Sequence, residues 1–440
     1  MLAAAGASVG LGNIWRFPYL CARYGGGIFL IVYVILAVTF GYTMIIAETA
    51  IGRAAKKGPV GAYNAYTDNK LLRAGGWVNA IVPMLIVPYY SVIGGWVCKY
   101  LYEYLHNDIN AIAADDFFGS FISNGPSTEF WFIVFTLIVV VIILLGVQNG
   151  IEKVSKIMMP ILVVLAVILS IYSVTRPGAL EGVKYILIPN FSDFSIMTVV
   201  SAMGQMFYSL SIAMGILITF GSYIKKEVSI EKSTVQVEIF DTAIAIFASF
   251  MIIPAVFSFS GGEPESLKAG PSLMFITMPK IFASMGVGRI MGILFFLLVL
   301  FAAVTSAIAL MESAVSSFVD EFGWDRKKGT VVMTLIMIAL GTLSSLGYGP
   351  LASVTMFGMQ FLDFFDFITN SVMMPIAALA TCILIVRYIG LNKIEEEVTL
   401  SEHPFKRKIV FDFMIRFLCP VFVIIILISS VASVLGLIQV

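Results

Sequence analysis

The chain has 440 residues, of which 59% are hydrophobic and only 12% carry a charged side chain. Soluble globular domains carry about 25% charged residues, so this composition excludes an ordinary soluble protein and indicates one that crosses a membrane several times. The formal net charge is zero, which excludes a global field that would recruit nucleic acid. The four cysteines and two histidines show no metal-binding spacing.

A membrane-spanning helix needs about 20 mostly apolar residues. The sequence predicts eleven such spans, in chain order at 2–22, 27–52, 76–105, 129–147, 153–175, 195–222, 236–260, 288–319, 330–347, 354–388 and 409–437. With the N-terminus in the cytoplasm, the loops on that side carry 18 Lys and Arg, and the opposite loops carry 6. The positive-inside rule therefore predicts a cytoplasmic N-terminus and an external C-terminus. The proline-containing loop 261–288 is expected to be external and to act as a lid.

The first predicted span is not a plain membrane helix. Three glycines loosen it, Asn13 and Arg16 interrupt its apolar run, and Pro18 ends it. Lipid offers no hydrogen bonds, so backbone released from a helix at membrane depth must be buried in protein or line a cavity. A broken helix of this kind is the best indicator in a sequence of a transporter's binding site.

The sixth predicted span repeats this pattern. Residues 204–215 (GQMFYSLSIAMG) place a Gln, a Tyr and two serines between glycines. The two segments stand five spans apart, and because five is odd the second half enters the membrane inverted. We therefore expect an all-α inverted-repeat transporter fold of five plus five spans over 1–388, with helices 1 and 6 broken, followed by an inner loop and an eleventh span over 389–440. The alternative is that the glycines only allow close helix packing.

An unwound helix would supply groups that bind a cation and groups that bind an anion. Its freed carbonyl oxygens can ligate a hard cation such as sodium, and the N–H groups at the start of the next half-helix favour a carboxylate. One break could therefore supply both parts of a site for an amino acid and sodium.

Several motifs resemble one known family, the neurotransmitter:sodium symporters, almost from end to end. They are 10–18 (GLGNIWRFP), 25–27 (GGG), 48–53 (ETAIGR), 89–90 (YY), 150–153 (GIEK), 204–215 and the Thr305-Ser306 pair. Eleven spans suit the bacterial amino-acid transporter branch of this family. The resemblance implies sodium-coupled symport of a neutral, hydrophobic or aromatic amino acid across the plasma membrane by alternating access.

The resemblance also implies two sodium sites. The first would use Ser8, Asn13, Ser209 and Asp241, and the second Gly6, Val9, Ala302, Thr305 and Ser306. All of these supply oxygen atoms, which hard cations prefer. Read alone, the Thr305 and Ser306 hydroxyls would more often bond their own backbone or a neighbouring helix.

The substrate should lie between the two breaks. The expected lining is Ser8, Gly10, Gly12, Tyr90, Tyr208, Ser209, Ser211, Met214, Ser306 and Leu310, with Val87 or Ser91 as further neighbours. The carboxylate would meet the sodium, the Tyr90 hydroxyl and the amides near Gly10 and Gly12. Met214 stands where the family often has phenylalanine, and its adaptable side chain leaves room for a larger substrate. Ser8 stands where the family's monoamine carriers have Asp, which disfavours amines without a carboxylate.

Placing a charged side chain at the centre of a membrane helix costs about 2.5–3.5 kcal/mol of insertion free energy, so each such residue is expected to have a partner or a function. Arg16 and Asp366 match the family's external gate, and Asp363, one turn away, could substitute for Asp366. Asp320 matches the acidic half of the internal gate. The arginine that pairs with it in the family is absent, so we expect residues 1–440 as written to transport poorly. Glu48 and Glu312 are expected to be structural.

Asp241 bears on chloride. Tyr33, Gln205 and Ser209 match three chloride ligands of animal relatives, whereas the fourth position, near Ala245, offers no hydroxyl. A fixed carboxylate beside the sodium can replace the charge of the anion. We therefore expect transport that does not require chloride.

Other classes of function predict different properties. A proton-coupled carrier of the same architecture would not need Thr305 and Ser306, and its uptake would follow pH. A channel is harder to reconcile with a lid loop and paired gate charges, and a sensor would share the site without flux. An enzyme is disfavoured because the sequence shows no nucleophile–base pair and no phosphate or cofactor fingerprint. The expected partners are the amino acid, sodium and the lipid bilayer.

Overall fold

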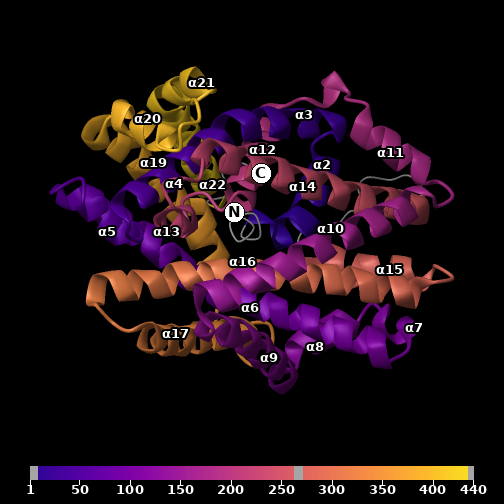
Figure 1. Cartoon of the computed structure of the whole chain (residues 1–440). Coiled ribbons are helices and arrows are strands. Elements are labelled where there is room, and N and C mark those ends of the chain that lie inside the picture. The colour runs from indigo at the N-terminus through magenta and orange to yellow at the C-terminus, as the bar shows by residue number, and fades with distance from the viewer. Residues whose placement is uncertain (1–7, 262–270, 435–440) are drawn as a thin grey trace.

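The computed structural model describes residues 8–261 and 271–434, which are almost entirely helical (Figure 1). Nine helices in these ranges are long and apolar enough to cross a membrane. They are α3–α4 (Gly27–Ala55), α6 (Lys70–His106), α9 (Gly125–Leu144), η3–α10 (Val147–Val174), α14 (Ile230–Ser260), α16 (Gly288–Phe322), α17 (Arg326–Leu346), α18–α19 (Phe361–Ile389) and α21–α22 (Lys408–Ala432).

The two remaining predicted spans, the first and the sixth, are the two that the sequence marks as broken. In the first, residues 9–10 leave the helix, and the chain winds again through the π-helical turn η1 (Gly12–Arg16) and α2 (Phe17–Arg23). In the sixth, residues 210–215 separate α12 (Ile196–Ser209) from α13 (Ile216–Tyr223). The predicted all-α fold with two interrupted helices is therefore confirmed. Residues 2–7, the start of the predicted first span, lie outside the described residues.

The break in the sixth span is held by one buried carboxylate. Ser211 and Ala213 adopt positive φ values of 55° and 60°, a left-handed conformation that costs an L-residue about 1–2 kcal/mol. The freed amide of Ala213 donates to Glu48 Oε1 of α4 (Tyr42–Ala55) at 2.9 Å. Glu48, which is fully buried, therefore supports the unwound backbone.

Glycines bring α13 and α4 into close contact. A Cβ at Gly52 would lie 1.9 Å from the Ile218 carbonyl oxygen, and one at Gly221 would lie 2.5 Å from that of Thr49. Neither position tolerates a side chain, so the two backbones pack directly on each other. The inner half of span 6 is thereby fixed against span 2.

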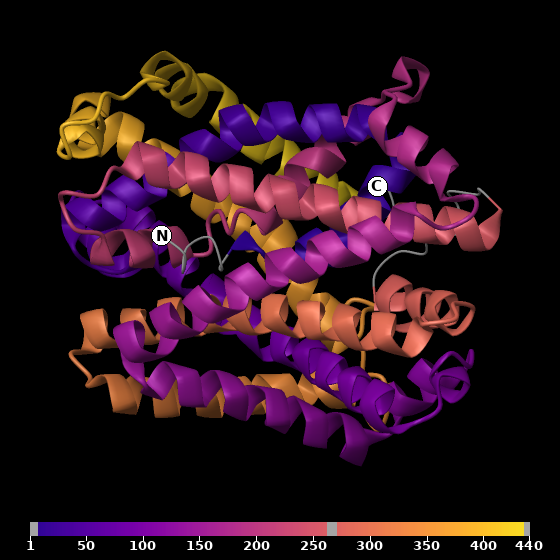
Figure 2. The same ribbon diagram turned by 45° about the vertical axis from the view of Figure 1, so that its right-hand side comes forward.

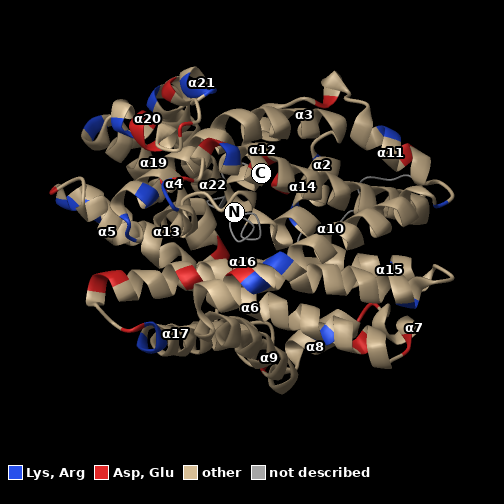
Figure 3. Cartoon of the chain, viewed as in Figure 1, with Lys and Arg blue, Asp and Glu red and all other residues tan. Residues whose placement is uncertain are grey.

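The long helices form two layers on either side of the breaks. Figures 1 and 2 show α6, α9, α16 and α17 running side by side, with α4, α12, α13 and α14 on the other side. Shorter helices connect them: α5 (Pro59–Asn64), α7 (Ile109–Ile112), α8 (Phe117–Ser123), α11 (Ala179–Leu187), η6 (Leu273–Thr277), α15 (Met278–Ala283) and α20 (Leu391–Thr399). Lys and Arg concentrate at the end of the bundle that carries α5, α17, α20 and α21 (Figure 3).

The prediction for the start of the tenth span was wrong. The helix begins at Phe361 rather than at residue 354, and 347–360 form turns with one isolated bridge between Met356 and Met359. Phe357 and Gly358 adopt positive φ values of 53° and 77° in this turn. The apolar run continues through the segment, but Phe357 is 85% exposed and packs into no core.

The predicted external loop 261–288 contains helical structure. Its described part includes η6 and α15, and Phe275 of η6 stacks on Phe118 of α8 with ring centroids 5.1 Å apart. The Tyr100 hydroxyl of α6 donates to the Phe275 carbonyl at 2.7 Å. This segment therefore closes over the end of α6, while residues 262–270 lie outside the described residues.

Candidate substrate and sodium site

A cavity lies between the two helix breaks. All ten residues expected around the substrate line it. The complete lining in the described chain is Ser8, Gly10, Gly12, Asn13, Ile86, Tyr90, Tyr208, Ser209, Ser211, Met214, Ile216, Ser306 and Leu310. Its open space is about 20 Å³, enough for about one water molecule. The walls are therefore closed on one another, and a substrate must push them apart.

Two lining residues were missed from the sequence. Ile86 and Ile216 face the cavity, whereas the expected alternatives Val87 and Ser91 do not line it. Ile86 lies one helical turn before Tyr90, and residues four apart share a helix face. Ser91 points away, and its hydroxyl bonds the Val87 carbonyl of its own helix at 2.7 Å. Applying the helical period to Tyr90 would have selected Ile86.

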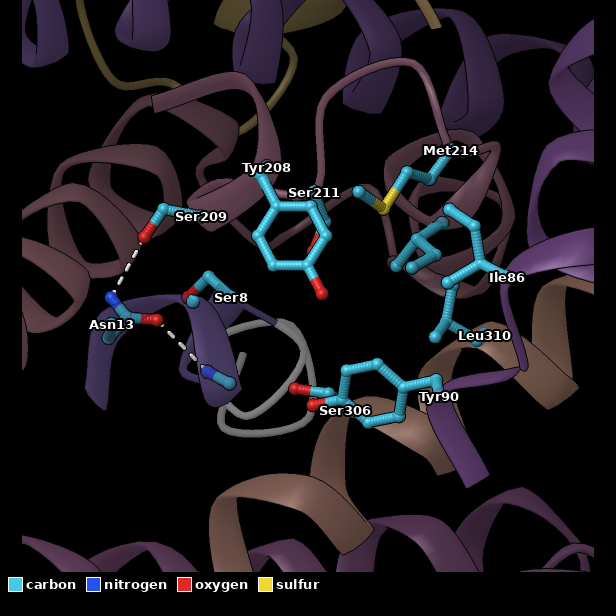
Figure 4. Close-up of a pocket in the computed structure, with 13 residues that line it drawn as sticks. Ser8, Asn13, Ile86, Tyr90, Tyr208, Ser209, Ser211, Met214, Ser306 and Leu310 are labelled. Atoms are coloured by element: carbon cyan, nitrogen blue, oxygen red, sulfur yellow. Dashed lines mark hydrogen bonds between the residues drawn. The ribbon is translucent and has the colours of Figure 1, made fainter. Parts of the chain in front are cut away.

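The cavity has a polar half and an apolar half. Figure 4 shows the side chains of Ile86, Met214 and Leu310 grouped on one side. The hydroxyls of Ser8, Tyr90 and Ser306 lie toward the break in span 1 (Figure 4). No Asp, Glu, Lys or Arg is among the described lining residues. The side-chain environment is therefore neutral.

The backbone supplies opposite partial charges across the cavity. The half-helix that begins at residue 11 presents its N-terminal amides, and Leu11 N–H donates to the Tyr90 hydroxyl at 3.3 Å. On the other side, α12 ends at Ser209 and presents its C-terminal carbonyls. A helix N-terminus favours an anion and a C-terminus favours a cation. The geometry suits the two charges of a zwitterion.

Three expected ligands of the first sodium site lie in direct contact. Asn13 Nδ2 donates to Ser209 Oγ at 2.8 Å and to Asp241 Oδ1 at 2.7 Å, and Ser209 Oγ donates to the same carboxylate oxygen at 2.8 Å. Asn13 Oδ1 accepts from the Gly10 amide at 3.0 Å. Asn13 and Asp241 are fully buried, and Ser8 and Ser209 nearly so. Residues from spans 1, 6 and 7 thus converge on one oxygen-rich point.

The second oxygen of Asp241 is also bonded. It accepts from the Tyr33 hydroxyl at 2.9 Å. Gln205, the third residue matched to a chloride ligand, instead donates to the Gly12 carbonyl at 3.0 Å. The Asp241 carboxylate therefore receives the Tyr33 and Ser209 hydroxyls that would otherwise be available to an anion.

The expected second sodium site brings span 8 against the break in span 1. Ser306 Oγ donates to the Val9 carbonyl at 3.2 Å. Thr305 Oγ1 contacts the Ala302 carbonyl at 3.2 Å and that of Phe301 at 2.9 Å. These oxygens form a donor set that fits sodium, although the hydroxyls also make the helix-to-backbone bonds typical of membrane Ser and Thr. The expected ligand Gly6 lies outside the described residues.

Of the outer-gate candidates, Arg16 lies next to Tyr208, which lines the cavity. The Arg16 guanidinium is 5.7 Å from the centre of the Tyr208 ring. Asp366 accepts from Tyr89 Oη at 3.2 Å and from Asn370 Nδ2 at 2.5 Å, and no ion pair joins it directly to Arg16 in the described chain. Asp363 is engaged by a different residue, since the Tyr348 hydroxyl donates to it at 3.2 Å.

Two separate polar contacts lie on the side of the bundle that is predicted to face the cytoplasm. Asp320, the expected inner-gate acid, accepts from the Gly58 amide at 2.5 Å. Glu312, fully buried in α16, pairs with Arg326 at 2.5 Å and accepts from the Tyr223 hydroxyl at 2.8 Å. Tyr223 ends α13, so Glu312 links the inner half of span 6 to α16.

Comparisons with known proteins agree with this architecture. The profile of the Sodium:neurotransmitter symporter family matches residues 1–115 and 118–437. The sodium-dependent transporter YhdH of Bacillus subtilis is 32% identical over 98% of this chain and 96% of its own length. A sodium-dependent transporter of Haemophilus influenzae is 31% identical over the same shares. A crystal structure of MhsT in complex with L-phenylalanine superposes with a TM-score of 0.87 at 36% identity, covering 98% of this chain and 97% of MhsT.

These findings define a multi-span membrane transporter with the inverted-repeat fold, in a family of transporters and not a class of enzymes. The chain belongs to the sodium:neurotransmitter symporter family and is a sodium-dependent symporter. The resemblance drawn from its motifs is confirmed.

Proposed function

We propose that the protein uses inward sodium flow to drive uptake of a neutral, hydrophobic or aromatic amino acid across the plasma membrane. The observation that carries this proposal is the facing pair of helix breaks, with amides on one side of the cavity and carbonyls on the other. A cytoplasmic N-terminus is part of the proposal, supported by the excess of Lys and Arg on the predicted inner loops and by their concentration at one end of the bundle (Figure 3).

The lining of the cavity supports the proposed substrate class. A carboxylate would bind the amides at Leu11 and Gly12, the Tyr90 hydroxyl and the first sodium, and the amino group would bind the carbonyls at the break in span 6. The side chain would enter the half formed by Ile86, Met214 and Leu310, which offers no charge to pair with. The relative MhsT was crystallised with L-phenylalanine, which supports an amino acid with an apolar side chain.

Two sodium ions are proposed as co-substrates. Asn13, Ser209 and Asp241 with Ser8 would hold the first. Val9, Ala302, Thr305 and Ser306 with Gly6 would hold the second, which joins span 8 to span 1. Both ions bind where a broken helix meets a neighbouring helix, so sodium binding draws the spans together and completes the substrate site.

Chloride is proposed not to be required. The Asp241 carboxylate already accepts the Tyr33 and Ser209 hydroxyls. Its fixed charge beside the sodium would balance the cation as an anion would.

Transport would proceed by alternating access. Sodium and substrate bind from outside, and Tyr208 with Arg16 and Asp366 closes above them. Opening of the inner side then requires the inner halves of the broken helices to move, including the Tyr223–Glu312 contact. Sodium leaves down its gradient and carries the substrate with it.

A thermal-shift screen of twenty amino acids in sodium and in potassium tests this proposal. A ligand at 100 times its Kd stabilises the folded protein by about 2.7 kcal/mol. Hydrophobic or aromatic amino acids should raise the melting temperature in sodium only. Stabilisation that is equal in potassium, or that follows pH, would favour a carrier not driven by sodium.

A further inference from the structure

The Tyr208 hydroxyl is the one tyrosine hydroxyl lining the cavity that makes no hydrogen bond to the described residues. The Tyr90 hydroxyl, also in this lining, accepts from Leu11 N–H. No hydrogen bond involves the Tyr208 hydroxyl within the described chain. Figure 4 shows it pointing into the space above Tyr90 and Ser306, away from the end of its own helix. A polar group held in this position needs a partner when the site is filled.

The ring that carries this hydroxyl is held on both sides. A Cβ at Gly12 would lie 2.5 Å from Tyr208 Cδ1, so the ring packs directly on the backbone of the first break. The Arg16 guanidinium lies 5.7 Å from the ring centre. Because the ring sits between these two groups of span 1, its hydroxyl reaches across the cavity toward α6 rather than out toward the bilayer.

The neighbours of the hydroxyl belong to the anion-binding half of the site. Tyr90 lines the same cavity (Figure 4), and the Tyr90 hydroxyl is itself bonded to the Leu11 amide. The apolar half, formed by Ile86, Met214 and Leu310, lies to the other side (Figure 4). A substrate carboxylate drawn to the Leu11 and Gly12 amides would therefore lie between the two tyrosine hydroxyls.

We infer that Tyr208 is a substrate-binding residue whose hydroxyl donates a hydrogen bond to the substrate carboxylate, opposite Tyr90. This inference rests on the proposed function. The Tyr208 ring would then close fully over the site only when the ligand carries a carboxylate to which its hydroxyl can donate. Amino acids are then selected over amines by Tyr208 as well as by the helix terminus.

The test compares purified Tyr208→Phe, Tyr90→Phe and unaltered protein. Isothermal titration with L-phenylalanine, L-leucine and L-valine in sodium gives the affinities and their rank order. Tyr102→Phe is the matched control, because Tyr102 is 45% exposed and stacks on His106 outside the site. A hydrogen bond to a charged partner is worth roughly tenfold or more in affinity. Tyr208→Phe should therefore weaken all three amino acids by roughly tenfold and keep their rank order.

Three outcomes separate the claims. Stabilisation by sodium alone, measured by thermal shift, should be unchanged in Tyr208→Phe, which shows that the variant is folded and that its cation sites are intact. Unchanged amino-acid affinity, or a loss that reorders the three ligands, would overturn the role assigned to Tyr208 and leave the proposed function standing. If the unaltered protein binds no amino acid in sodium, the proposed function falls and this inference falls with it.

Discussion

Asn13 Nδ2 lies 2.7 Å from Asp241 Oδ1, although 228 residues separate the two in the chain. The contact joins η1, just after the break in span 1, to α14, and Ser209 at the end of α12 bonds both partners. The three side chains are thus assembled by the fold. A sodium ion at this point would replace hydrogen bonds among them by ion–oxygen contacts, and the Asn13 amide would turn its oxygen from the Gly10 amide toward the ion.

Replacing Asp241 by Asn should make transport dependent on chloride. The substitution removes the fixed negative charge but leaves the Tyr33 and Ser209 hydroxyls free to hold an anion. We expect the sodium concentration for half-maximal uptake to rise at least tenfold in gluconate, about 1.4 kcal/mol, and chloride to restore part of the loss. Uptake assays with chloride replaced by gluconate measure this. Collapse of uptake by the unaltered protein in gluconate would contradict the account.

Removing hydroxyls of the second sodium site should weaken the coupling of uptake to sodium, while the protein still binds its substrate. Thr305→Val and Ser306→Ala each remove an oxygen that contacts a backbone carbonyl at 3.2 Å. We expect each to raise the half-saturating sodium concentration roughly fivefold to tenfold, from a loss of about 1–1.4 kcal/mol. Ser317→Ala in the same helix is the control, because its hydroxyl bonds only the Ser313 carbonyl at 2.9 Å. Equal sodium curves for all three variants would remove the second site from the mechanism.

A methyl group at Gly12 should block the site. Its Cβ would lie 2.5 Å from the Tyr208 ring, so the ring must move away from its place over the cavity. Gly204→Ala is the matched control, since nothing lies within 4 Å of a Cβ at that position of α12. We expect Gly12→Ala to abolish substrate-induced stabilisation and Gly204→Ala to retain it, both measured by thermal shift. Normal binding by Gly12→Ala would show that Tyr208 does not close against this glycine.

Asp366 and Asp363 can be separated as outer-gate candidates. Asp366 is held by Tyr89 and Asn370 near Arg16, whereas Asp363 accepts from Tyr348. We expect Asp366→Asn to lower the uptake rate roughly fivefold to tenfold, equivalent to about 1–1.4 kcal/mol, and Asp363→Asn to change it less than twofold. Initial rates of sodium-driven uptake decide between them. The opposite ranking would assign the gate to Asp363.

The sequence predicted the breaks because their composition conflicts with a lipid-facing helix. The polar side chains of Asn and Arg in residues 6–18, and of Gln and Ser in 204–215, find no hydrogen-bond partners in lipid, and the glycines loosen both helices. Such segments must therefore be buried in protein or line a cavity. The substrate lining followed from matching these motifs to the family. The two lining residues that were missed, Ile86 and Ile216, are ordinary apolar residues in apolar helices, and nothing in their local sequence distinguishes them from the core.

Contacts between segments far apart in the chain could not be predicted from the sequence. Glu48 was expected only to be structural, and its bond to the Ala213 amide depends on how α4 crosses the break 165 residues later. The start of the tenth span was misplaced because Val354, Met356 and Phe357 look like membrane residues by composition. They instead form an exposed turn.

The most direct test of the central claim is flux into proteoliposomes that contain the purified protein. With an inward sodium gradient and gluconate as the only anion, radiolabelled L-phenylalanine or L-leucine should accumulate above its external concentration, and collapse of the sodium gradient should release it. Accumulation driven equally by a proton gradient in potassium, or sodium-dependent binding with no flux at all, would contradict the account.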